Sequence, residues 1–184
     1  MKHTHASRWL IALSAAGAML LGACTDGDTE GADDTTGQPP ALQASGGGET
    51  EAAGLGSYCW TPPEGSGQPG LCADATGIVT SADALAVDAG DEVVLEPTEQ
   101  DALAAATAVN VQLWPRDEIG DPISSGDWGV AWNPGAAQAT VIEATLTADS
   151  ITFVAPEESG AYIVSLFVTF ENGDAMYGLQ LEVG

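Results

Sequence analysis

The last 24 residues, AYIVSLFVTFENGDAMYGLQLEVG, constrain the fold of this chain more than any other segment. Asn172-Gly173 divides them into two alternating stretches, and both residues accept positive φ, so the pair predicts a type I′ hairpin. Folding the chain there pairs Phe170 with Ala175 and continues in steps of two, which puts the large apolar side chains on one face. The opposite face is more polar. The segment therefore predicts two long antiparallel strands with one face on a core.

Shorter stretches upstream show the same alternation between turn signals that recur every 8 to 15 residues. AVNVQLW alternates from Val109 to Leu113. In ATVIEATLTADSITFVAP, an apolar face runs through Ile142 and Leu146, and Ile151 with Phe153 follows an Asp-Ser turn. This spacing favours a sandwich or a barrel. EQDALAAA (99–106) is helix-prone and predicts at most one helical turn in a connection.

The segment before the hairpin carries a short motif, Glu158-x-Gly160-x-Tyr162. It resembles the pattern that opens strand F of immunoglobulin-like domains, where the tyrosine hydroxyl ties the corner. Val164 stands where antibody-type domains have the inter-sheet cysteine, so the resemblance implies the fold without that disulfide. The predicted fold class is all-β, an immunoglobulin-like antiparallel β-sandwich. We place it at 55–184, a normal size for one domain.

Cys59 and Cys72 flank a Pro-, Gly- and Ser-rich loop in GSYCWTPPEGSGQPGLCAD. Metal ligation would need more thiols or histidines, and redox catalysis favours Cys-x-x-Cys. In an oxidising compartment the expectation is a disulfide, which would contribute ~3 kcal/mol in the chain-entropy model. GSYCW followed by a second cysteine also resembles a motif of small secreted bacterial proteins without an assigned biochemical role. That resemblance carries no information about the activity of this chain.

The N-terminus predicts export and a lipid anchor. MKHTHASR is basic, and the 13 apolar residues that follow are too few to cross a bilayer, which needs about 20. Leu21-Gly22-Ala23-Cys24 resembles the lipobox of bacterial lipoproteins. The resemblance implies cleavage before Cys24, acylation of this cysteine and attachment to the extracytoplasmic side of the cell membrane. Ordinary secretion with a chance cysteine is the alternative.

The segment after Cys24, from Thr25 to Ala53, is acidic and rich in Gly, Thr and Pro. Such a composition buries too little apolar surface to offset the entropy of ordering. The expected organisation is a signal peptide at 1–23, a lipidated cysteine and disordered linker at 24–54, and the sandwich with its disulfide loop at 55–184.

Charge limits the function. Beyond the predicted signal, 27 acidic residues face one basic residue, Arg116, and no Lys or His remains, giving a charge of -26. Nucleic-acid binding depends on basic side chains and is excluded. A serine or cysteine nucleophile would lack a neighbouring base, so only a carboxylate pair could catalyse a reaction. We expect Arg116 to pair with a neighbouring acid.

Two clusters are candidate binding sites. Trp60, Trp114, Trp128 and Trp132 form a candidate aromatic platform for sugar rings, with core packing as the alternative. Asp117, Asp121 and Asp127 form a candidate calcium site, with a solvated loop as the alternative. No cofactor is expected.

The sequence thus favours a lipid-anchored cell-envelope binding or adhesion module that is not an enzyme. Its partner would be an envelope protein or a glycan, and its oligomeric state is left open. Two alternatives stand beside it: a carboxylate-dependent glycosidase or similar hydrolase, and a structural component of an envelope complex.

Overall fold

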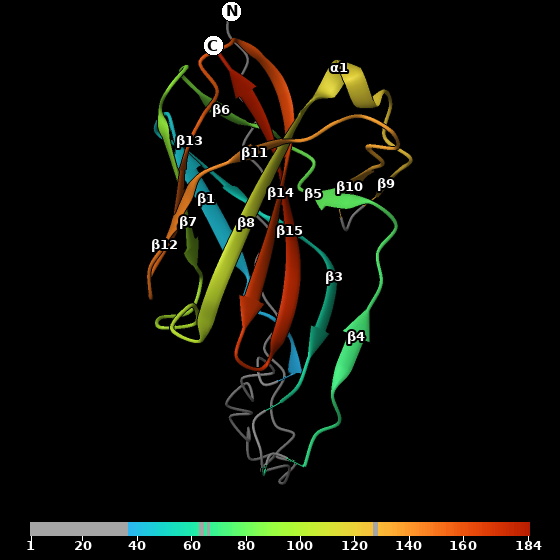
Figure 1. Cartoon of the computed structure of the whole chain (residues 1–184), viewed down its shortest axis with the longest axis vertical. Coiled ribbons are helices and arrows are strands. Elements are labelled where there is room, and N and C mark those ends of the chain that lie inside the picture. Colours follow the sequence, from blue (N-terminus) through green and yellow to red (C-terminus); the bar gives the residue numbers. More distant parts are fainter. Residues whose placement is uncertain (1–36, 63–64, 66, 127–128) are drawn as a thin grey trace, which may run out of the picture. The chain divides into compact units, whose positions relative to one another are not determined.

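The computed structural model describes residues 37–62, 65, 67–126 and 129–184, all within one compact unit, Asp33–Gly184. The predicted signal peptide and Cys24 lie outside these residues. In the part described, no helix is long and apolar enough to cross a membrane. Nearly all regular structure is β, and two large sheets face one another across a core (Figure 1).

The first sheet has five antiparallel strands in the order β12-β13-β7-β1-β2. Its strands are β1 (Leu42–Gly46), β2 (Glu49–Ala52), β7 (Glu92–Pro97), β12 (Ala144–Leu146) and β13 (Ile151–Val154).

The second sheet follows the order β11-β8-β14-β15-β3-β4, and β6 adds to β15 in parallel. Its strands are β3 (Gly54–Trp60), β4 (Leu71–Ala73), β6 (Leu85–Val87), β8 (Ala106–Pro115), β11 (Thr140–Ile142), β14 (Gly160–Phe170) and β15 (Gly173–Val183).

The predicted fold class is confirmed. By their order within the sheets, β1, β7, β13 and β12 take the places of strands A, B, E and D of an immunoglobulin sandwich, and β8, β14 and β15 those of C, F and G. Inward side chains of both sheets form one core, in which Tyr177, Phe153 and Leu95 are fully buried. The predicted apolar faces of 140–146 and 151–153 pack against this core or belong to it.

Two insertions extend the sandwich. The first, 47–84, separates β1 from β6 and contains β2 to β5 (Ile78–Thr80). The second, 116–139, separates β8 from β11 and contains α1 (Arg116–Ile119), β9 (Ser124–Gly126) and β10 (Gly129–Trp132). The insertions meet in a small antiparallel sheet, β5-β10-β9. This small sheet packs on the outer side of the second large sheet, where Trp132 and Ile78 join Trp114 and Ile163 in a second buried cluster.

The C-terminal hairpin forms, but its register differs from the prediction by two residues. Phe170 pairs with Gly173, and Val168 rather than Phe170 pairs with Ala175. The turn residues are therefore Glu171 and Asn172, and neither has positive φ. Because side chains alternate with a period of two, this shift leaves the same residues facing the core, so the apolar pattern could not distinguish the registers.

The predicted disordered linker is wrong over its last part. Residues 42–46 and 49–52 are strands, and β1 pairs with β7 and β2 inside the first sheet. Leu42 and Ala44 are fully buried, and the Tyr177 hydroxyl donates a hydrogen bond of 2.8 Å to the Pro40 carbonyl. Composition did not predict these strands because both carry few apolar residues and are ordered by the sheet that they join. The domain begins before Leu42 and not at Leu55.

The helix-prone segment 99–106 forms consecutive turns instead of a helix. Backbone bonds run from Ala102 to Glu99, from Ala104 to Asp101 and from Ala106 to Leu103, each spanning three residues.

Candidate functional site

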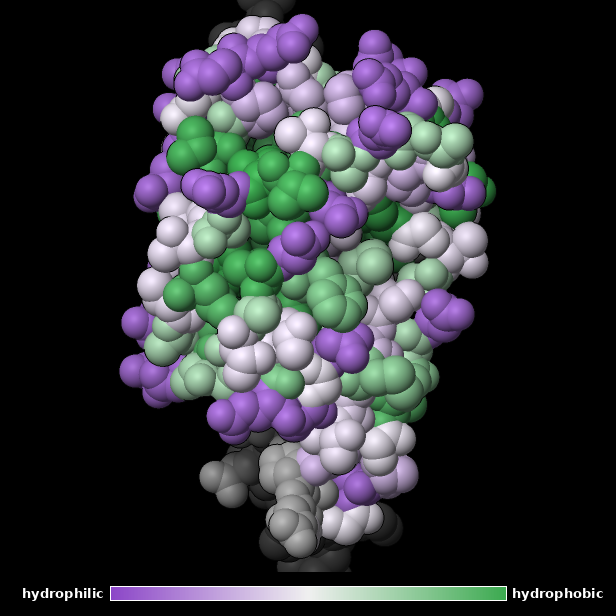
Figure 2. Space-filling model, viewed as in Figure 1, coloured by the Kyte–Doolittle hydropathy of each residue, from purple (hydrophilic) through white to green (hydrophobic). Residues whose placement is uncertain are grey.

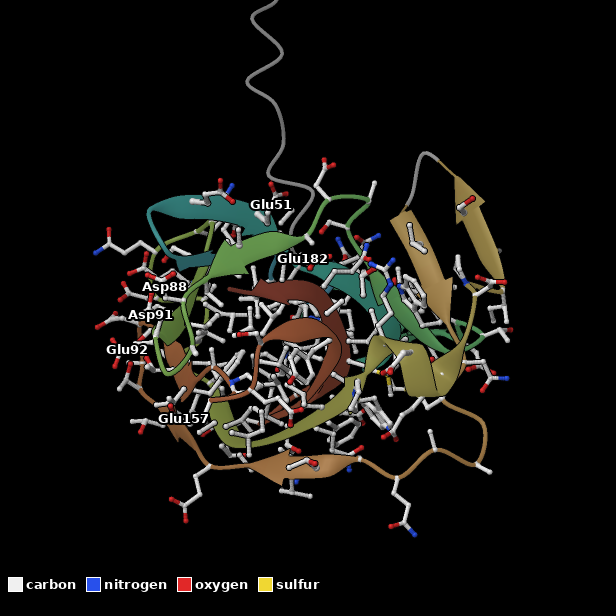
Figure 3. All side chains as sticks on the ribbon, turned by 90° about the horizontal axis from the view of Figure 1, so that it is seen from above. Glu51, Asp88, Asp91, Glu92, Glu157 and Glu182 are labelled. Atoms are coloured by element: carbon white, nitrogen blue, oxygen red, sulfur yellow. A yellow bond between two sulfur atoms is a disulfide. The ribbon has the colours of Figure 1, made fainter. Side chains whose placement is uncertain are left out.

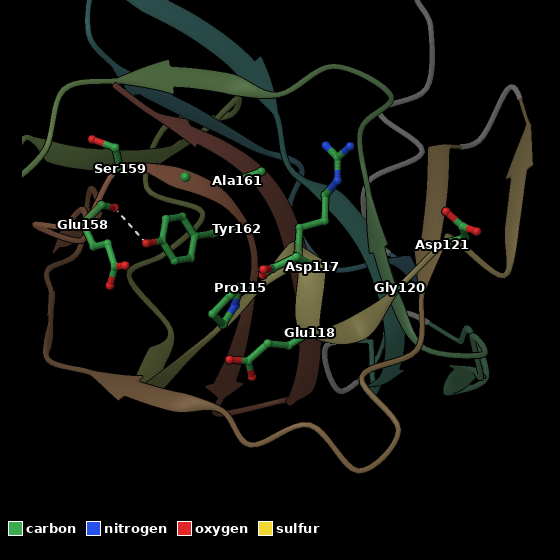
Figure 4. Close-up of a pocket in the computed structure, with 11 residues that line it drawn as sticks. Pro115, Asp117, Glu118, Gly120, Asp121, Glu158, Ser159, Ala161 and Tyr162 are labelled. Carbon is green, nitrogen blue, oxygen red and sulfur yellow. Dashed lines mark hydrogen bonds between the residues drawn. The ribbon is translucent and has the colours of Figure 1, made fainter.

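The tyrosine corner forms as the immunoglobulin resemblance implied. The Tyr162 hydroxyl donates a hydrogen bond of 2.7 Å to the Glu158 carbonyl (Figure 4). Burial raises the pKa of Tyr162, and the negative charges of Glu158 and Asp117 raise it further. The corner therefore stands in a negative local field, which comes from two separate segments of the chain.

A polar hollow of about 670 Å³ lies between α1 and this corner. Asp117, Glu118 and Asp121 approach it from α1 and the loop after it, and Glu158 approaches from the corner (Figure 4). Acidic residues also crowd the neighbouring end of the sandwich, where Asp88, Asp91, Glu92, Glu157 and Glu182 are labelled in Figure 3. The whole end is thus strongly negative.

Arg116 was predicted to pair with an acid close to it in the sequence, but it pairs with the distant Glu182. Its Nη1 lies 3.7 Å from Oε1 of Glu182, at the far end of β15, and its guanidinium lies 5.6 Å from the ring centroid of Trp132. Both charged side chains are about half exposed, so the ion pair contributes little to stability.

The structure gives the predicted calcium site no support. Asp117 and Asp121 line the polar hollow, whereas Asp127 lies outside the described residues. Among the residues described, no group of three or more His, Cys, Asp and Glu side chains could hold a metal ion. Asp117 lies on α1 and Asp121 in the loop after it, and both side chains are exposed.

The aromatic platform is wrong for three of its four tryptophans. Trp60 is buried in the main core, edge-on to Phe170 with ring centroids 5.0 Å apart. Trp114 and Trp132 are buried in the second cluster, and their indole N–H groups donate to the Ala137 carbonyl and the Thr80 hydroxyl. Core packing, the alternative, holds for these three, and Trp128 lies outside the described residues.

The disulfide prediction is confirmed. Cys59 of β3 and Cys72 of β4 are directly opposed, with Cα atoms 4.1 Å apart. Both cysteines are exposed, because Tyr58 and Trp60 occupy the alternate positions that face the core. The bridge therefore joins the strands of a surface hairpin and contributes no packing to the interior.

A second surface, the outer face of β8, β14 and β15, was not predicted from the sequence. The small sheet covers one half of this face. The other half is open and has a hollow of about 300 Å³. We call it the Phe167 hollow, and it is lined by Asn110, Gln112, Ser165, Phe167 and Met176.

Phe167 is the one large aromatic side chain among the described residues that is strongly exposed, at 42%. Strand pairing places Asn110 and Met176 directly beside it. On the side of the domain where β8 and β14 lie in front, hydrophobic surface gathers over the middle and hydrophilic residues crowd the upper end (Figure 2). The sequence held one sign of this surface: Phe167 is an aromatic residue on the face of the C-terminal hairpin that is otherwise more polar.

Comparisons with protein-family models, with curated proteins and with solved structures find no match for this chain.

Proposed function

We propose that this chain is a lipid-anchored, non-catalytic binding module of the cell envelope, and that it binds through the open half of the β8-β14-β15 face. One observation carries the proposal: the small sheet covers this face only in part, and Phe167 stays exposed beside a hollow. Exposed aromatic side chains rimmed by polar groups are characteristic of interaction surfaces.

The place where the chain enters the domain supports an anchored orientation. The Pro40 carbonyl accepts a hydrogen bond from the Tyr177 hydroxyl, and the Ala41 carbonyl accepts one from the Thr98 amide. The loop after β3 and the segment before β8 both form backbone hydrogen bonds with the hairpin turn at 171–172. The entry point therefore lies at the hairpin-turn end of the sandwich. The acidic end is the opposite one, where Gly184 bonds to Val87.

An anchor at Cys24 would hold this hairpin-turn end toward the membrane. Sixteen peptide bonds separate Cys24 from Pro40, which limits their distance to at most about 55 Å. The acidic end would point away from anionic lipid headgroups, which repel it.

The anchor is tested by Cys24→Ser in the full chain. We expect the variant to lose metabolic labelling with a fatty-acid probe and to be released from membranes, because the acylated thiol is gone. Continued labelling and membrane fractionation of the variant would refute the lipoprotein assignment.

Binding is tested with the purified full chain and envelopes from cells that lack it. We expect saturable binding that Phe167→Asp abolishes, while Val154→Asp, at a 52% exposed position of the other sheet, has no effect. Equal losses in both variants, or no binding by the unaltered chain, would refute the proposed surface.

A carboxylate-dependent hydrolase is the second candidate. The observation that favours it is that Glu118 and Glu158 reach the same polar hollow from different elements. Glycoside hydrolysis uses such a pair. Release of reducing ends from envelope polysaccharide that is lost in Glu118→Gln and Glu158→Gln would establish this function; no release by the unaltered chain would reject it.

A further inference from the structure

The Phe167 hollow contains polar side chains that the protein itself does not use. Ser165 is only 7% exposed, yet its hydroxyl makes no hydrogen bond with any described residue, and neither do the side-chain amides of Asn110 and Gln112. Asn110 is exposed, and the polar side-chain atoms of Ser165 and Gln112 are not among the fully buried, unpartnered atoms of the described residues, so all three side chains are open to solvent. They are therefore available to a ligand.

The covered half of the same face shows the opposite situation. Gln180 lies there on β15, and its amide nitrogen donates to the carbonyls of Ser81 and Ala82 at 2.8 and 3.2 Å. Where the protein covers this face, a polar side chain is satisfied by backbone. Where the face is open, three polar side chains are left without protein partners, which is the arrangement of a binding surface.

The hollow is neutral in a chain of charge -24. Its lining offers two amides, a hydroxyl, a thioether and an aromatic ring, and no ionisable group. Asp174 is the nearest acid along β15 on this outer face, two residues from Met176. An anionic ligand would find no cation here and would be repelled by the rest of the molecule. A cationic ligand would find no carboxylate in the lining of the hollow and would be attracted to the acidic surfaces outside it.

Amides and hydroxyls both donate and accept hydrogen bonds, which suits a ligand with many neutral hydroxyl groups. An exposed phenyl ring can pack against the apolar C–H face of a pyranose. The volume lies at the lower limit for small-molecule sites and matches an open subsite rather than a deep pocket. We infer that the Phe167 hollow binds a neutral sugar unit of an envelope glycan, a conclusion that rests on the proposed binding function and names its ligand class.

The test uses the full lipidated chain, purified in lauryldimethylamine oxide because this detergent has no sugar headgroup. Neutral oligosaccharides built from glucose, galactose, mannose or N-acetylglucosamine are screened on an array, and hits are titrated by calorimetry. We expect binding of at least one neutral oligosaccharide, and no binding of its sulfated counterpart.

Variants locate the site. Phe167→Ala should weaken Kd about tenfold or more, and Gln112→Ala should weaken it by a smaller factor. Phe167→Tyr keeps the ring and should retain binding, and Val154→Ala, an exposed position on the other sheet, should leave Kd unchanged.

The outcomes separate this inference from the proposed function. Absence of binding to every neutral oligosaccharide, or binding that Phe167→Ala does not weaken, overturns the inference. If the same preparation still binds envelopes through Phe167, the binding function stands with a ligand of another class. If it binds neither, both fail.

Discussion

Two tyrosine hydroxyls fasten the domain: Tyr162 bonds to a neighbouring segment and Tyr177 to a distant one. Tyr177 is fully buried and donates to the Pro40 carbonyl, 137 residues away. Tyr177→Phe leaves that carbonyl without its partner, and we expect a loss of about 1–3 kcal/mol in the free energy of unfolding. Urea unfolding measures it. Tyr58→Phe is the matched control, because the Tyr58 hydroxyl makes no hydrogen bond with a described residue. Equal midpoints for Tyr177→Phe and the unaltered chain would contradict the assigned role.

The same tyrosines make stability depend on alkaline pH. Burial raises the pKa of Tyr177 and Tyr162, so the folded state keeps protons that the unfolded state releases above about pH 10. Stability is unaffected by them below pH 10 and falls as pH rises further, by up to about 1.4 kcal/mol per pH unit for Tyr177. Lys and free Cys side chains also titrate in this pH range, but the chain has neither beyond residue 36, so the tyrosine effect is not masked by them. Urea midpoints from pH 8 to 11.5 measure the fall, and Tyr177→Phe should flatten it; a midpoint that stays constant above pH 10 would contradict it.

Residue-level prediction succeeded where partners are close in sequence. The Tyr162 bond to Glu158 spans four residues and follows from a local motif. The partners of Tyr177 and Arg116 are brought near by strand pairing over the whole chain, so sequence spacing could not identify them. The burial of Trp114 and Trp132 could not be identified from sequence spacing either, because the two side chains come together only where the second insertion packs on the sheet beneath it.

At the level of elements, the disulfide stabilises a hairpin whose loop cannot form a core. Cys59 and Cys72 are 13 residues apart and exposed, so the bridge acts mainly by restricting the unfolded chain. We expect Cys59→Ala with Cys72→Ala to lower the free energy of unfolding by about 3 kcal/mol. Urea unfolding with and without dithiothreitol tests this: reductant should shift the unaltered chain to the midpoint of the variant and leave the variant unchanged. A reductant effect on the variant would point to another cause.

The hairpin shows what an element-level pattern can and cannot specify. Alternation identified the strands, their faces and their pairing with each other. The register depended on Gly173, which was expected to supply positive φ in the turn. Its actual role is close approach: a Cβ there would lie 2.1 Å from the Cys59 carbonyl oxygen of β3. Because β3 belongs to an insertion whose place in the sheet is not visible in the sequence, this requirement could not be foreseen.

For the whole molecule, the position of the first strand decides what part of the chain is the domain. Strand β1 fills the place between β7 and β2, its Leu42 and Ala44 side chains are fully buried, and Pro40 supplies the acceptor for Tyr177. A chain that starts at Leu55, the boundary expected from composition, lacks all three contributions. Losing one buried Leu side chain alone typically costs about 2–5 kcal/mol, a large part of the total stability of a domain.

We therefore expect the fragment 37–184 to unfold in one cooperative thermal transition and 55–184 to show none. Circular dichroism with temperature and amide dispersion in proton NMR measure the difference. A third fragment, 37–184 with Leu42→Ala, should melt cooperatively at a lower temperature, because it keeps the strand and loses only one side chain. This ordering separates a required strand from a dispensable linker: if 55–184 melted cooperatively within a few degrees of 37–184, β1 would be peripheral and the tether would extend to residue 54.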